Sequence, residues 1–303
     1  MTLTTIPWPS GLVLLGLASV ASLPACSGST KNQPPPATAQ AAQEPADDVA
    51  MALMEHHRYH HHGGVTLFIA MSLDTIAVAP EKSATIAPIR AELVASMNPG
   101  RVAEQALLTT LADGLAAGTI DTAKVDAGVA DVTTAARSVH DRTEDALNQL
   151  HAALSPAERA ALADKVVAHW AVWKRVNGDE TGAAPREGGH LATLASELDL
   201  TADQVNQIEA AMARDTKAVP PLDPKEIDAE LRAFGEAFRR DTFDAKALTA
   251  ADEANAHMVG WAAAHLAHFV EAVGPVLAPD QRTALADKLR AHAAHDPSAE
   301  ATP

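Results

Sequence analysis

Apolar residues recur at steps of three and four along most of the chain, which is the spacing of the buried face of an α-helix. One such stripe predicts a continuous helix of about thirty residues in the middle of the chain. A second stripe predicts another long helix nearer the C-terminus. The first stripe consists of Val125, Val129, Val132, Ala136, Val139, Thr143, Leu147, Leu150 and Leu154, and the second of Met258, Ala262, Leu266, Phe269, Val273 and Val276.

Shorter helices are predicted before each long one, and prolines separate them because proline cannot continue a helix. The breaks fall at Asn98-Pro99-Gly100 and at the proline-rich stretch 220–224, while Pro88 lies inside a helix and predicts a kink. The apolar share of 47% comes mainly from Ala, Leu and Val, with only five Phe, four Trp and one Tyr. This composition favours closely packed helices over strands, so we expect an all-α fold. The short helices are expected at 80–97, 101–117, 201–217 and 223–240.

The chain resembles itself at a shift of 123 residues. Residues 154–165 and 277–288 share eight of twelve positions, and a shift of 122 aligns the preceding helices. A register kept to within one residue predicts a tandem duplication. The two helical units are expected at 64–176 and 188–294, joined by a polar linker at 177–187, with a disordered tail at 295–303.

Two helix starts carry the pattern of a capping box, Ser155 with Glu158 and Thr201 with Gln204. In such a box the hydroxyl accepts from the amide three residues on, and the Glu or Gln side chain accepts from the capping residue's own amide. Gln281 opens the last helix in the same way, although Ala278 stands where the hydroxyl residue is expected. Residues 79–82 keep neither capping residue.

With this repeated Leu-Thr-x-x-Gln pattern, complete at Leu200 to Gln204, the chain resembles the Spy/CpxP family of periplasmic proteins, which includes ZraP and CnrX. The resemblance covers 64–294 twice over and implies a four-helix hooked hairpin for each unit. Proteins of the Spy type form an antiparallel, cradle-shaped dimer that holds unfolded clients without ATP. A duplicated chain is therefore expected to be a pseudo-dimer in which one chain supplies both halves.

The N-terminus reads as a bacterial lipoprotein precursor. The apolar run 11–21 is shorter than the roughly 20 residues that span a bilayer, and it leads into Leu-Pro-Ala-Cys at Cys26. We expect a signal peptide at 1–25, lipid on Cys26 and a flexible Pro/Gln-rich linker over 26–46. A plain secretory signal is the alternative. The protein is thus expected in the periplasm, held by its lipid alone, and Ser27 favours the outer membrane.

The formal net charge of −16 opposes binding to nucleic acid. The single cysteine excludes intrachain disulfides and Cys-based metal clusters. No glycine-rich phosphate loop, nucleophile motif or zinc-protease helix is present, so we do not expect an enzyme or a required cofactor.

The segment 47–63 is rich in histidine and is expected to be helical. Imidazoles four residues apart on a helix can share one zinc, copper or nickel ion, and the alternative is a solvated flank that binds metal incidentally. A further stripe of His257, Trp261, His265 and His268 is interpreted as boundary packing. The candidate ligands are Glu55, His56, His57, His60, His61 and His62.

The leading interpretation is a lipid-anchored, ATP-independent chaperone or envelope-stress protein whose partners are unfolded or misfolded envelope proteins. The alternative is a periplasmic heavy-metal-binding sensor or resistance protein of the ZraP/CnrX type. A third reading is an inhibitor that docks on a sensor kinase, as CpxP does.

Overall fold

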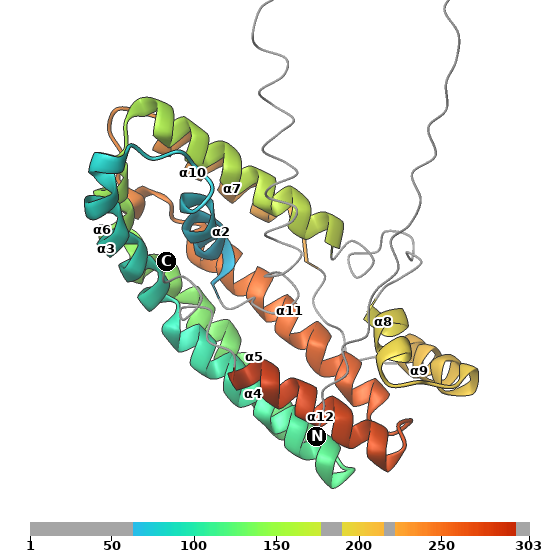
Figure 1. Cartoon of the computed structure of the whole chain (residues 1–303). Helices are drawn as coiled ribbons and strands as arrows, with labels where there is room; N and C mark the ends of the chain where they lie inside the picture. The colour runs from blue at the N-terminus through green and yellow to red at the C-terminus, as the bar shows by residue number, and fades with distance from the viewer. Residues whose placement is uncertain (1–62, 177–189, 215–221, 295–303) are drawn as a thin grey trace, which may run out of the picture. The chain divides into compact units, whose positions relative to one another are not determined.

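The computed structural model describes residues 63–176, 190–214 and 222–294. These residues form helices and no strand, so the all-α prediction is confirmed (Figure 1). All of the described residues belong to one unit of the chain. The elements are α2 (Gly64–Leu73), α3 (Pro80–Ser96), α4 (Asn98–Ala117), α5 (Thr122–Arg137), α6 (Val139–Ala153), α7 (Pro156–Val176), α8 (His190–Glu197), α9 (Ala202–Arg214), α10 (Pro224–Phe238), η1 (Ala245–Ala247), α11 (Ala251–Val273) and α12 (Pro279–Ala294).

The prediction of one continuous thirty-residue helix in the middle of the chain is wrong, because two helices occupy this stretch. The helix is interrupted at Ser138, so that α5 ends at Arg137 and α6 begins at Val139. The Ser138 hydroxyl donates to the carbonyl of Ala135 at 2.9 Å, a side-chain bond that competes with the helical pattern. The apolar stripe continues across the break, and for this reason periodicity did not reveal it. The corresponding α11 is uninterrupted.

Local chemistry sets the other helix boundaries. Pro99 lies in the first turn of α4, where a missing N–H is tolerated, and Gly118 ends that helix with φ of 74°. Asp121 and Asp223 cap α5 and α10 by accepting the amides of Lys124 and Lys225. None of the described helices is both long enough and apolar enough to cross a membrane.

The described helices build two large apolar cores, and α11 contributes to both. The first core joins α2, α3, α6, α7 and α10 to the N-terminal part of α11. The second joins α4, α5, α8, α9 and α12 to the rest of α11. The two units expected from the sequence therefore interlock, since α4 packs on α12 and α5 packs on α11 (Figure 1).

Helix α2 is an almost wholly apolar element inside the first core. Its first turn is capped from another helix, because the Val65 amide donates to Oδ1 of the buried Asn255 at 2.8 Å. Gly64 has φ of 55°, and a Cβ there would lie 2.3 Å from the same Asn255 oxygen. Glycine at this position is thus required by both the backbone and the space.

Candidate functional site

The Leu-Thr-x-x-Gln pattern forms a connection between the first turns of α9 and α12, which we call the α9–α12 joint. Thr201 and Gln204 make the reciprocal bonds of a capping box: Oγ1 of Thr201 accepts the Gln204 amide at 3.2 Å, and Oε1 of Gln204 accepts the Thr201 amide at 3.0 Å. Gln281 Oε1 accepts the Ala278 amide at 2.9 Å at the start of α12. Each glutamine therefore caps its own helix with its carbonyl oxygen.

The amide nitrogens of the same two glutamines connect the helices to each other. Gln204 Nε2 donates to Gln281 Oε1 at 2.7 Å and to the carbonyl of Val276 at 3.2 Å. Gln281 Nε2 donates to the carbonyl of Leu198 at 3.0 Å, just before the turn that leads into α9. A glutamine is suited to this double role because its side chain both accepts and donates. The joint fixes where α9 starts relative to α12.

The first half contains a second connection of the same form between α3 and α7, the α3–α7 joint. Glu158 Oε2 accepts the Ser155 amide at 2.7 Å and caps α7, while its other oxygen accepts the Ala79 amide at 3.4 Å. Lys82 Nζ donates to Glu158 at 2.5 Å. At shifts of 122 and 123 residues, Lys82 takes the place of Gln204 and Glu158 that of Gln281. An ion pair thus stands where the other half has a pair of amides.

Electrostatics distinguish the two joints. Hydrogen bonds from Lys82 and Ser155 lower the pKa of Glu158 to about 2. A carboxylate with a lowered pKa in the folded state stabilises the protein above the unfolded value near 4.5, and this contribution is lost as the pH falls toward 2. The glutamine pair carries no charge and has no such dependence.

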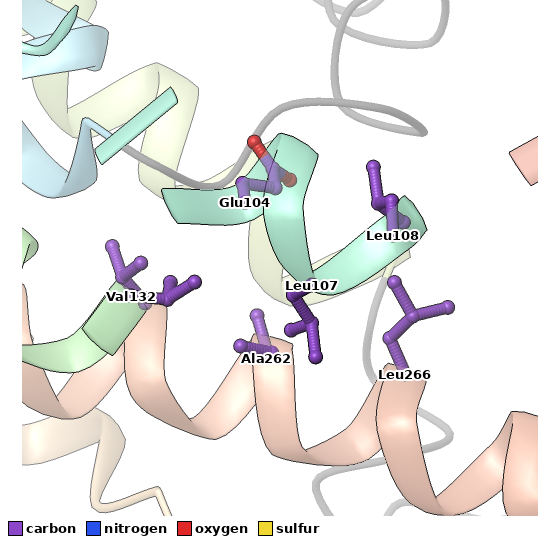
Figure 2. Close-up of a pocket in the computed structure, with 8 residues that line it drawn as sticks. Glu104, Leu107, Leu108, Val132, Ala262 and Leu266 are labelled. Atoms are coloured by element: carbon purple, nitrogen blue, oxygen red, sulfur yellow. The ribbon is translucent and has the colours of Figure 1, made fainter. Parts of the chain in front are cut away.

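A small apolar hollow lies where α4, α5 and α11 meet (Figure 2). Its volume of about 20 Å³ is enough for roughly one water molecule, so it is not a substrate pocket. The side chains of Leu107 and Leu266 line it, and Glu104 stands at its polar side.

The expected lipid and metal sites lie outside the described residues, namely Cys26, Glu55, His56, His57, His60, His61 and His62. Within the described ranges, no three His, Cys, Asp or Glu side chains are placed to hold a metal ion. In the histidine stripe of α11, Trp261 is buried and lies against His265 with ring centroids 4.3 Å apart. His257 Nδ1 instead contacts a Glu226 oxygen at 2.8 Å.

Two buried titratable side chains escaped the sequence reasoning. His169 is fully buried on α7 without a hydrogen bond to either ring nitrogen, and burial lowers its pKa to about 4. Glu230 is 4% exposed on α10, and burial together with the charge of Asp252 raises its pKa to about 7. Glu230 interrupts an otherwise apolar stripe of α10, which is the signal that could have revealed it.

The α9–α12 joint predicts coupling between its two glutamines. We expect Gln204→Ala and Gln281→Ala each to lower the free energy of unfolding by about 1–2 kcal/mol, because each removes a cap and a bond between helices. The double variant should lose less than the sum, as interacting residues do. Urea denaturation measures all three, and Gln207→Ala on the exposed side of α9 is the matched control. Strictly additive losses would show that the two amides do not interact.

Comparison with known proteins gives a match that covers much of the second expected unit. Residues 186–289 match the model described as LTXXQ motif family protein. No curated protein and no solved structure matches the chain. The matched residues include both glutamines of the α9–α12 joint. The matched stretch contains α8 to α11 and most of α12, so this part of the chain is similar to the LTXXQ motif family.

Proposed function

We propose that this protein is a lipid-anchored periplasmic chaperone that holds unfolded envelope proteins without ATP. The observation that carries the proposal is the LTXXQ match over 186–289. These residues include the Leu-Thr-x-x-Gln pattern that gives the chain its resemblance to Spy-type proteins, which hold unfolded clients in a cradle. Lipidation at Cys26 and export by the segment 1–25 are part of the same proposal.

We also propose that the two halves of the chain arose by duplication and act as the two partners of a dimer. Three features support this. The α3–α7 and α9–α12 joints use positions that correspond at shifts of 122 and 123 residues. The α4 helix of one half packs on the α12 helix of the other. Both cores draw on α11, so each half depends on the other for burial.

The surface limits how a client would be held. Within the described ranges the large apolar side chains that are well exposed are Val102, Val167 and Met212, which lie on three different helices. Apolar residues scattered in this way bind an unfolded client only weakly. The net charge of −16 attracts the basic segments of a client from a distance. We therefore propose that basic unfolded chains are preferred and that binding weakens as salt rises.

Light scattering of an aggregating model protein tests the chaperone role. We expect an equimolar amount of the purified chain to suppress aggregation of a basic unfolded protein without ATP, and to act less on an acidic one because of charge repulsion. Added salt should reduce the difference between the two clients. Failure to suppress aggregation of either client would contradict the proposed function.

A metal-binding role is the second candidate, and it rests on the spacing of the histidines in 56–62. Calorimetric titration with Zn²⁺, Cu²⁺ and Ni²⁺ compares the wild type with a variant in which His56, His57, His60 and His61 are changed to Ala. A specific site predicts tight binding that the variant loses, since two imidazoles four residues apart can share one ion. Equal weak binding by both proteins would contradict it.

A further inference from the structure

Helix α10 covers the most aromatic part of the described structure. Its buried stripe includes Phe234 and Phe238, whose rings lie 5.0 Å apart, and Phe238 contacts Phe243 at 5.1 Å. The same core contains Trp170, Trp173 and Trp261 from α7 and α11. Within the described ranges, all the Phe and Trp residues except Phe269 thus lie in or against this one core.

A carboxyl group lies inside the buried stripe of this helix. Glu230 is 4% exposed and is flanked by the buried Ile227 and Leu231. Burial and the negative charge of Asp252 on α11 raise its pKa to about 7. Oδ1 of Asp252 is itself buried without a hydrogen bond. The contact between α10 and α11 therefore places two carboxyl groups together in a setting that favours a proton over two charges.

The cationic groups near this contact act on Asp252: the charge of Asp252 contributes to the raised pKa of Arg137 on α5, and His140 on α6 partly opposes the rise in the pKa of Asp252. Behind Asp252 lie Asp141 and His140 of α6, and burial followed by the charge of Asp141 raises the pKa of Asp252. Two ion pairs join α7 to α10, and neither involves Glu230. Lys174 pairs with Asp228 at 2.9 Å, and Arg239 pairs with Asp164 at 2.6 Å. On α10 itself, Arg232 acts on Asp228.

A second polar contact joins α10 to α11 on the same side. His257 Nδ1 lies 2.8 Å from Glu226 Oε2, and His257 Nε2 lies 3.7 Å from Glu253. These contacts are ion pairs only when the imidazole is protonated. Glu226 lies one helical turn before Glu230, so both contacts lie on the same side of α10.

We propose that α10 is a proton-dependent cover over the aromatic core. It lies closed on α11 while Glu230 carries its proton, and it separates from α11 as Glu230 loses that proton. The ion pairs of Lys174 and Arg239 keep it attached along α7. The surface that opens includes Phe234 on α10 and Met258 and Trp261 on α11, and its ligand class is an extended apolar segment of an unfolded protein.

The direction of the pH effect follows from linkage. A carboxyl whose pKa is about 7 in the closed state and near 4.5 when exposed stabilises the closed state fully below pH 4.5. That stabilisation is lost as the pH rises through about 7. The opening constant of α10 should therefore rise about 40-fold between pH 5 and pH 7.

Hydrogen exchange of the α10 amides in the full chain, corrected for intrinsic exchange rates, measures this constant. Wild type should show the rise, Glu230→Gln should abolish most of it, and Asp252→Asn should reduce it by removing the neighbouring charge. Glu236→Gln is the matched control, because Glu236 is an exposed carboxyl on the same helix. The amides of α4 should not follow the change.

An α10 opening constant that stays the same from pH 5 to pH 7 would overturn the proposal. So would a Glu230→Gln variant that exchanges like wild type, or an equal rise in α4. The binding of an unfolded segment by the opened surface rests on the proposed chaperone function, whereas the pH-dependent opening of α10 does not. Suppression of client aggregation at pH 5 and pH 7 is a separate measurement: its absence at both values would remove the chaperone role while the exchange data still decide whether α10 opens.

Discussion

The fold depends on the burial of α11 on both sides. This helix supplies Met258 and Trp261 to one core and Val259 and Val270 to the other. A chain rich in Ala and poor in aromatic residues buries little area per side chain, so each half gains stability by sharing a central helix with the other. Neither core is complete without α11. The packing of α4 from one half on α12 from the other likewise buries apolar surface between the halves.

The two joints show how one arrangement can be held by different chemistry. In the α9–α12 joint, Gln204 and Gln281 cap their helices and bond to each other without charge. In the α3–α7 joint, Lys82 and Glu158 occupy the corresponding places as an ion pair. Both solutions satisfy amides at the start of two helices, which would otherwise lack partners. The stability that the α3–α7 joint provides depends on the ionisation of Glu158, whereas the stability that the α9–α12 joint provides does not depend on pH.

Local features were readable from the sequence, and features that depend on distant partners were not. Thr201 and Gln204 lie three residues apart, so their capping bonds follow from spacing alone. The bond from Gln204 to Gln281 spans 77 residues and required the fold. Ser138 interrupts a helix through one hydroxyl without disturbing the apolar stripe, and this made the break invisible to periodicity. The burial of Glu230 depends on where α11 lies, although a charge within an apolar stripe marks it as unusual.

The central claim of the proposal is that the two halves of one chain act as the two partners of a dimer. Sedimentation equilibrium of the purified, non-lipidated protein over a wide range of dilutions measures its mass directly. The account predicts the mass of a single chain, which is 31.5 kDa for the full sequence, at every concentration. A dimer that persists at the greatest dilution would contradict it, because interlocked halves leave no core surface for a second copy to complete.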